Sequence, residues 1–171
     1  MIAKFRNLSF LFLLLHAVFA VGCQMERPTK IIVEGGPVPT FRLSGSGNLS
    51  SFSVYLVPPS PEKMDKPFSQ QVPLWQISAQ PDSLHGRGVE EIQRLTFGLA
   101  PAGYKGNFPE NNGSAPSIEP EKIYFYSCDT TDAPPTAGFF MIHDGKAIPT
   151  QAKTPCWRTQ NGKWVAAPCI N

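Results

Sequence analysis

The sequence predicts an all-β fold, an antiparallel β-sandwich of immunoglobulin or fibronectin-III type, and three observations support this prediction. Short apolar runs recur along the chain and are separated by turn-forming residues, which include 18 prolines and 14 glycines. Several runs alternate apolar and polar residues with the period of two that a half-buried strand requires. No window keeps the i, i+3, i+4 spacing of a long amphipathic helix. A β-barrel is the alternative arrangement of the same strands.

The predicted strands are 31–33, 40–43, 52–57, 74–78, 95–99, 122–128, 138–143, 146–148, 157–159 and 163–165. In the strand at 40–43, Phe41 and Leu43 share one face and Arg42 lies on the other. The clearest early strand has Phe52, Val54 and Leu56 on one face, and Ser53 and Tyr55 alternate with them. The strand at 122–128 is apolar or aromatic on both faces, which is typical of a central strand in a sheet. The chain from 60 to 72 is predicted to be a long polar loop.

Two short dipeptides predict hairpins. Asp144-Gly145 and Asn161-Gly162 each lie between two predicted strands, and these residue pairs favour two-residue turns. The segment from Gly88 to Leu95 is the best helical candidate and has room for one or two turns. The fold is therefore expected to be almost entirely strands and loops.

The first 23 residues carry the features of an export signal. Lys4 and Arg6 form a short basic region, and an almost unbroken apolar run of 12 residues follows from Leu8 to Phe19. A membrane-spanning helix needs roughly 20 apolar residues, so this run has the length of a secretory signal peptide. The segment Ala20-Val21-Gly22-Cys23 that follows it resembles the lipobox of bacterial lipoproteins.

The lipoprotein resemblance implies transfer of a diacylglycerol to the Cys23 thiol, cleavage after Gly22 and acylation of the new amino terminus. Several acyl chains on one residue give a stable anchor, whereas a single chain holds a protein only marginally. Gln24 follows the cysteine, and in the sorting rule of enterobacterial lipoproteins this implies export to the outer membrane. The alternatives are an ordinary secreted protein with a chance cysteine and an uncleaved anchor helix.

Length and net charge limit the number of domains and the type of partner. Removal of residues 1–22 leaves 149 residues, which suits one domain. The precursor has 15 basic and 13 acidic side chains, and two basic ones leave with the signal peptide, so the mature chain is balanced. This balance argues against a nucleic-acid partner. The expected organisation is a signal-peptide helix at 1–22, a lipidated tether at 23–30, a β-sandwich at 31–150 and a C-terminal hairpin or tail at 151–171.

The remaining cysteines predict one disulfide. Export to an oxidising compartment favours a bridge, and three cysteines leave one free thiol. We predict the pair Cys156–Cys169, because a two-residue turn at Asn161-Gly162 brings position 156 opposite 167, two residues from Cys169. Cys128 ends a strand that is predicted to be buried, where a free thiol behaves as a small hydrophobic group. There is no CxxC spacing, so neither a metal site nor a cofactor is predicted.

The sequence contains histidines and carboxylates that could serve in catalysis, but none of them lies in a recognisable catalytic pattern. His85 lies in a glycine-containing loop with Asp82 nearby, and His143 ends a predicted strand. Without an identifiable nucleophile, a solvated side chain explains either histidine better than a general base does. The carboxylate pairs at 90–91 and at 119 and 121 are too close in sequence to face each other across a glycosidase cleft. A non-catalytic protein is favoured, and a periplasmic hydrolase with a site assembled only in space is the alternative.

Aromatic side chains are the best candidates for binding, because exposed rings stack on sugars or anchor partner proteins. The candidates are Tyr104, Phe108, Trp157 and Trp164. The stretch from Leu95 to Tyr104 also resembles one that recurs in small bacterial envelope lipoproteins, which implies no known activity. We therefore expect a lipid-anchored outer-membrane protein, facing the periplasm or the surface, that binds or scaffolds. Its expected partners are the membrane, through Cys23, and another envelope protein or cell-wall glycan.

Overall fold

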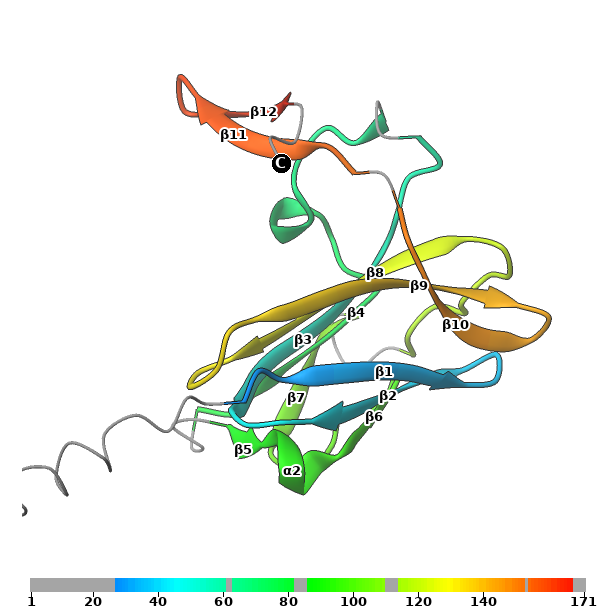
Figure 1. Cartoon of the computed structure of the whole chain (residues 1–171), viewed down its shortest axis with the longest axis vertical. Coiled ribbons are helices and arrows are strands. Elements are labelled where there is room, and N and C mark those ends of the chain that lie inside the picture. Colours follow the sequence, from blue (N-terminus) through cyan, green and yellow to red (C-terminus); the bar gives the residue numbers. More distant parts are fainter. Residues whose placement is uncertain (1–26, 61–62, 82–85, 110–113, 153, 168–171) are drawn as a thin grey trace, which may run out of the picture.

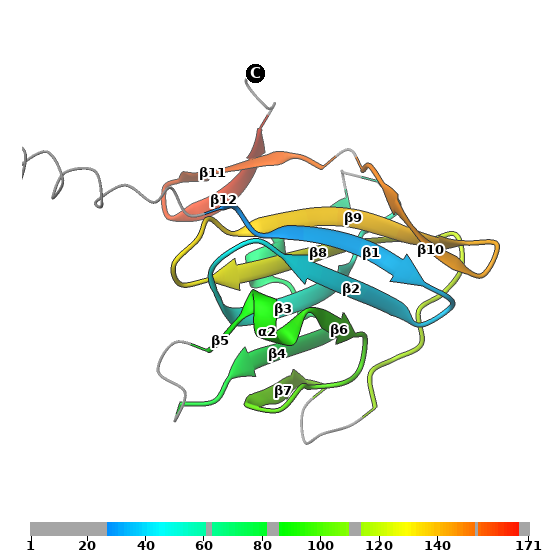
Figure 2. The same ribbon diagram turned by 60° about the horizontal axis from the view of Figure 1, so that its bottom comes forward.

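Antiparallel strands make up nearly all of the regular structure in the computed structural model, which describes residues 27–60, 63–81, 86–109, 114–152 and 154–167. The predicted signal peptide, Cys23, His85 and Cys169 lie outside these residues. Two sheets pack face to face, and a hairpin near the C-terminus stands apart from them (Figures 1 and 2). The predicted all-β sandwich is therefore confirmed.

The sheets differ in size. The smaller sheet has the order β1-β2-β6, with bounds Lys30–Gly35, Pro39–Ser44 and Arg94–Thr96. The larger sheet has seven strands. Six of them follow the order β10-β9-β8-β3-β4-β7, and the seventh, β5 (Arg87–Gly88), pairs with β3. In that order the bounds of the six are Lys146–Thr150, Thr136–His143, Ile123–Thr130, Asn48–Leu56, Trp75–Ala79 and Tyr104–Phe108. The short helical elements are η2, Phe68–Gln70, and α2, Val89–Ile92. The division into seven and three strands differs from the four and three of an immunoglobulin constant domain, so the finer immunoglobulin or fibronectin-III likeness is not confirmed.

Phe41 of β2 lies at the centre of the core. It is fully buried, and its ring centroid lies 4.7 Å from that of Phe52 and 5.5 Å from that of Phe140. Both partners belong to the larger sheet, so this one side chain joins the two layers. Leu43 is buried on the same face of β2 and Arg42 is exposed on the other, as the alternation in the sequence predicted.

Strand β8 is central, as predicted, with β3 on one side and β9 on the other. Tyr124, Tyr126 and Cys128 are buried against the core. Phe125 points to the opposite, outer face of the larger sheet, where it stacks on Phe68 at a centroid distance of 4.2 Å. The apolar character of both faces of β8 therefore has two causes, the sandwich core and a smaller aromatic cluster outside it.

Both predicted hairpin turns are confirmed. Asp144 and Gly145 have φ angles of 48° and 69°, and Asn161 and Gly162 have φ angles of 52° and 73°. Positive φ at both central residues is the geometry of the type I′ turn, which matches the twist of antiparallel strands. The first turn joins β9 to β10. The second joins β11, Cys156–Gln160, to β12, Lys163–Ala167.

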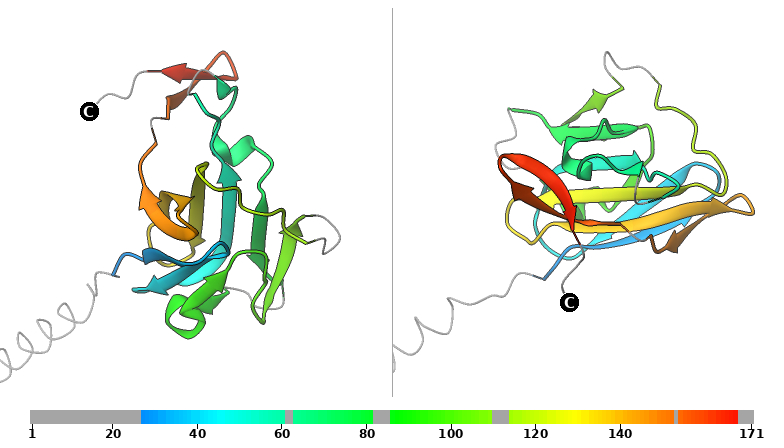
Figure 3. Two further views of the ribbon diagram at one scale, coloured as in Figure 1. Left: turned by 90° about the vertical axis from the view of Figure 1, so that its right-hand side faces the viewer. Right: turned by 90° about the horizontal axis from the view of Figure 1, so that it is seen from above.

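The C-terminal hairpin has the predicted register, with position 156 opposite 167. It forms its own two-stranded sheet beyond one end of the sandwich (Figure 3). Cys156 is disulfide-bonded, whereas Cys128 is free and buried. Because Cys169 lies outside the described residues, its pairing with Cys156 stays a prediction.

Two local predictions differ from the structure. Strand β6 ends at Thr96, so Leu99 does not share the buried face of Leu95 and is 64% exposed. The cause is a turn at Gly98, whose φ of +85° favours glycine and takes the chain out of the strand. The predicted helix is shorter than its segment, because Gln93 leaves the helical conformation with a φ of 55°.

Candidate functional site

Three surface hollows of similar size, about 350 to 440 Å³, are candidates for a binding site. A site that recognises a ligand needs a few polar groups that converge on one point, together with apolar surface. Because the volumes are similar, we compare the hollows by the side-chain groups that line them.

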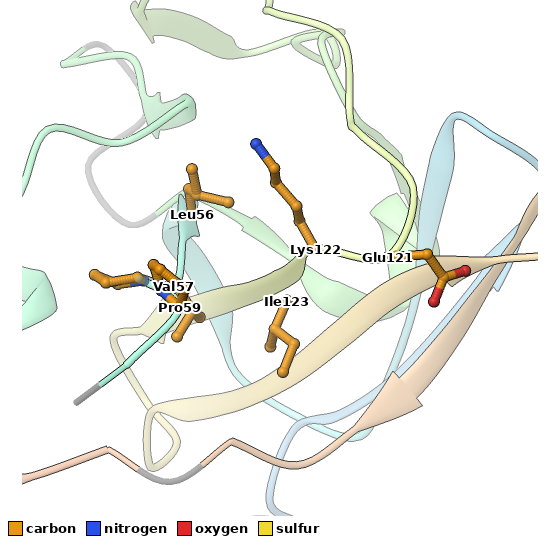
Figure 4. Close-up of a pocket in the computed structure, with 7 residues that line it drawn as sticks. Leu56, Val57, Pro59, Glu121, Lys122 and Ile123 are labelled. Atoms are coloured by element: carbon orange, nitrogen blue, oxygen red, sulfur yellow. The ribbon is translucent and has the colours of Figure 1, made fainter. Parts of the chain in front are cut away.

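The first hollow lies between the end of β3 and the start of β8 (Figure 4). Its walls are mainly Leu56, Val57 and Ile123, and its charged side chains are Glu121 and Lys122. Figure 4 shows these two charged side chains pointing in different directions. Each of them also has a partner outside the hollow. Glu121 Oε1 lies 2.8 Å from His143 Nδ1, and Lys122 Nζ lies 2.6 Å from Glu119 Oε2. The hollow is thus an apolar recess without converging polar groups.

The second hollow lies between the β1–β2 turn and the loops after β6 and before β8. Its lining residues are Pro37, Val38, Phe97, Gly98, Leu99, Ser114, Ala115, Pro116, Ser117 and Ile118. None of these side chains titrates, and two serines supply the only side-chain hydrogen-bonding groups. The described lining of this hollow is therefore apolar surface with few polar groups that could recognise a ligand.

The third hollow, which we call the outer-face hollow, lies on the face of the larger sheet that points away from the core. Its lining residues are Ser53 and Tyr55 of β3, Gln76 of β4, Phe125, Ser127 and Asp129 of β8, and Phe68 and Ser69 of the η2 segment. A solvent-facing sheet usually carries long charged side chains. Here the middle positions are serines, and their small size is what leaves the hollow open.

Strand register places the polar groups of this hollow in rows. Ser53 lies opposite Gln76 on one neighbouring strand and opposite Ser127 on the other. The Gln76 amide donates to Ser53 Oγ at 3.1 Å. In the next row, Ser51 Oγ donates to Asp129 Oδ2 at 2.7 Å. These bonds fix the orientation of the amide and of the carboxylate, and the second Asp129 oxygen has lone pairs for further donors.

Aromatic rings form the opposite end of the hollow. Phe68 stacks on Phe125 with an interplanar angle of 12°, and Tyr55 packs beside both at centroid distances of 5.7 and 6.1 Å. Phe139 of β9 extends the cluster, 5.3 Å from Phe125. Because the η2 segment covers this part of the sheet, Tyr55 is only 7% exposed although it faces outwards. The hollow therefore has an aromatic wall, a hydroxyl and amide floor, and one carboxylate.

The structure does not bring the four predicted binding aromatics together. Tyr104 and Phe108 lie on β7, whereas Trp157 and Trp164 lie on the C-terminal hairpin. Figure 1 shows β7 and the hairpin in separate parts of the molecule. Trp157 and Trp164 share one face of the hairpin by register, and Trp164 is 41% exposed. Phe108 is half-buried.

For Tyr104 the expectation of an exposed ring is wrong, because the side chain is 5% exposed and belongs to the core. Its hydroxyl donates to the Leu49 carbonyl at 2.7 Å and accepts from the Arg87 N–H at 3.0 Å. Burial raises the pKa of this hydroxyl. Tyr104 is therefore a structural residue that ties β7 to β3 and β5.

The histidine and carboxylate candidates do not form a catalytic site within the described chain. The hydrogen bond with Glu121 raises the pKa of His143, but this pair is solvent-exposed. Glu91 pairs with Arg87, and Glu119 pairs with Lys122. Among the residues that the structure describes, no group of three or more histidine, cysteine, aspartate or glutamate side chains is placed to hold a metal ion. Nor does any helix within those ranges have the length and apolar character to cross a membrane.

The aromatic wall of the outer-face hollow was not predicted. Alternation along β3 correctly put Ser53 and Tyr55 on the face opposite Phe52. The apolar character of both faces of β8 is the signal in the sequence for a second cluster, although a central position in the sheet is sufficient to account for the same pattern. Comparison of the chain with protein-family models, with curated proteins and with solved structures finds no match.

Proposed function

We propose that this chain is a lipid-anchored, non-catalytic binding protein of the outer membrane, and that the outer-face hollow binds cell-wall glycan. One observation carries the proposal: an aromatic wall, hydroxyl and amide groups, and a single carboxylate all line one hollow on a sheet face. The anchor is supported by the lipobox-like segment that ends at Cys23.

Carbohydrate is the ligand class that fits this lining best. Sugar rings present C–H faces, which pack on aromatic side chains, and rims of hydroxyl groups, which donate and accept hydrogen bonds. Asp129 can accept from two adjacent hydroxyls, and the Gln76 amide both donates and accepts. The described residues that line the hollow include no lysine, arginine or histidine. Because an anionic ligand requires such a cation, this lining fits a neutral ligand better.

The size of the hollow suits part of a polymer. Its volume of about 350 Å³ lies at the low end of the range for small-molecule sites, about 300–1,000 Å³. A glycan strand that crosses the face would thus place one unit of its length in the hollow.

Hydrolysis of the bound glycan is not supported by this geometry. Glycosidases place two carboxyl groups on opposite sides of the scissile bond, about 5–9.5 Å apart. Asp129 is the only carboxylate among the described residues that line the hollow. One carboxylate suits recognition of hydroxyl groups, and this favours binding over catalysis.

The test is binding of the full-length lipidated protein, in detergent, to purified peptidoglycan and its soluble fragments. Ser127→Leu should fill the hollow and lower the affinity at least tenfold. Ser117→Leu is the matched control, because it makes the same change in the second hollow, and it should bind as the unmodified protein does. Equal binding by both variants, or no binding by the unmodified protein, would overturn the glycan proposal. Capture of an envelope protein that is lost in Ser127→Leu alone would assign the hollow to a protein partner instead.

A further inference from the structure

We propose that one end of the sandwich is a membrane-facing surface that is held against lipid headgroups by a very short tether. This surface, which we call the β1 pole, consists of residues 27–29, the end of β2 with the β2–β3 loop at 44–47, and the β8–β9 loop at 131–135. The inference rests on the Cys23 anchor of the proposed function, but it does not depend on the ligand of the outer-face hollow.

The chain is fixed to the sandwich from Arg27 onwards, so the expected tether at 23–30 is wrong in its C-terminal part: Thr29 is buried and Lys30 begins β1. The Arg27 carbonyl accepts from the Ser46 N–H at 3.1 Å and from Ser46 Oγ at 2.6 Å. Thr29 is buried, and its hydroxyl donates to the Ser46 carbonyl at 2.8 Å. The Thr29 carbonyl accepts from Thr136 Oγ1, also at 2.8 Å. These bonds join the first described residues to the β2–β3 loop and to the start of β9, which are both distant in sequence.

The segments of the β1 pole pack closely against one another. A Cβ atom at Gly45 would lie 2.5 Å from the Pro28 carbonyl oxygen, and one at Gly47 would lie 2.8 Å from Ala133 Cβ. Both glycines also have φ angles above 100°. Asn48 adds a side-chain hydrogen bond to Asp132 at 2.8 Å. The segment that leads to the anchor therefore leaves the sandwich at a closely packed surface.

Only residues 24–26 lie between the anchored cysteine and the fixed segment. Four residue steps, from Cys23 to Arg27, span at most about 14 Å when fully extended. The β1 pole must then stay within that distance of the headgroups. Strand β1 runs from this pole to Gly35, and at about 3.3 Å per residue its far end lies roughly 17 Å further on.

The charges on the β1 pole do not oppose contact with a lipid surface. Its charged side chains are Arg27 and Asp132, one of each sign, and the rest of the surface is mostly serine, threonine, glycine and proline. Contact is therefore imposed by the length of the tether and not by attraction to anionic lipid, so it should change little with salt.

This orientation leaves the outer-face hollow open. Strand β3 begins next to the β1 pole at Asn48, and Ser53 of the hollow lies five residues further along the strand. That spacing puts Ser53 roughly 17 Å from the pole, whereas Asp129 lies two residues before the β8–β9 loop and marks the end of the hollow nearer to the membrane. A glycan strand that runs parallel to the membrane would then cross the hollow at the level of Ser53, away from the headgroups.

The test measures which end of the sandwich lies near lipid. Full-length lipidated protein carrying Pro134→Cys, in the β1 pole, or Asp144→Cys, in the β9–β10 turn at the far end, is labelled with a fluorophore at neutral pH. Cys128 should not react, because it is buried and burial raises its pKa to about 12. The protein is reconstituted in vesicles of phosphatidylethanolamine and phosphatidylglycerol with a nitroxide on the headgroups. Quenching should be several times stronger at position 134 than at 144.

A matched variant inserts ten glycine and serine residues between Met25 and Glu26, which keeps the anchor but releases the pole. Quenching at positions 134 and 144 should then become similar. Equal quenching without the insertion, in protein that stays bound to the vesicles, would overturn the proposed orientation alone. Protein that does not remain with the vesicles would overturn the anchor itself, and with it this inference.

Discussion

Tyr104→Phe tests whether Tyr104 is a structural residue, as its burial indicates. The substitution removes one oxygen atom that bridges the Leu49 carbonyl and the Arg87 N–H. Both backbone groups lie at the junction of β3 and β5, where the ladder between β3 and β8 is interrupted by a bulge after Leu49. Phenylalanine keeps the ring and its packing, so the change isolates the two hydrogen bonds.

The expected loss follows from the groups left unpaired. A buried backbone group without a partner costs about 1–3 kcal/mol. We expect the free energy of unfolding of Tyr104→Phe to fall by about 1–3 kcal/mol, measured by urea unfolding of the full-length protein in detergent. For a domain of this size the thermal midpoint should fall by roughly 3–10 °C. Lys105→Gln, an exposed change on the same strand, should stay within about 0.5 kcal/mol.

Glycan binding gives the second measurement on the same variant. Tyr104 belongs to the core cluster and is not part of the outer-face hollow, so Tyr104→Phe should bind peptidoglycan fragments with unchanged affinity. A variant that keeps its stability but loses affinity would show that Tyr104 contacts ligand, and would refute the structural assignment.

Three further predictions concern the cysteines. Labelled palmitate should enter the unmodified protein, and Cys23→Ser should abolish the labelling and release the protein from membranes; membrane-bound, unlabelled protein of both kinds would contradict the anchor. Non-reducing peptide mapping should join Cys156 to Cys169, and a fragment that contains Cys128 joined to either would be contrary to the free, buried thiol in the structure. Burial raises the pKa of Cys128 from 9.0 to about 12. The folded chain then keeps a proton that the unfolded chain loses, so the free energy of unfolding should fall as pH rises above 9.0 towards 12. The fall should be shallower in Cys128→Ala, and an identical pH dependence would argue against burial of the thiol.

Features that depend on neighbouring residues were predictable from the sequence. Asn161-Gly162 specifies a type I′ turn through its own φ preferences, and the turn then sets the register of the whole hairpin. Alternation along β2 likewise predicted that Phe41 and Leu43 face the core. In each case the signal lies within a few residues of the feature that it predicts.

Features that depend on distant contacts were not predictable. Tyr104 is buried because its ring packs in the core, and its hydroxyl bonds to a carbonyl 55 residues away. The polar loop at 60–72 gave no sign that Phe68 would cover the outer face of the sheet and stack on Phe125. The outer-face hollow arises from that long-range contact together with the serines of β3 and β8. Sequence alternation placed Ser53 on the correct face, but it did not show what would surround this side chain.

The most direct test of the glycan site is an NMR titration of protein labelled with ¹³C in its phenylalanine rings. Soluble peptidoglycan fragments are added to the full-length protein in detergent, and the ring signals are followed one by one. Phe68 and Phe125, which line the outer-face hollow, should shift together with a single dissociation constant. Phe97, which lines the second hollow, is the internal control and should not move. Shifts at Phe97 without shifts at Phe68 and Phe125, or no shifts at any ring, would contradict the account.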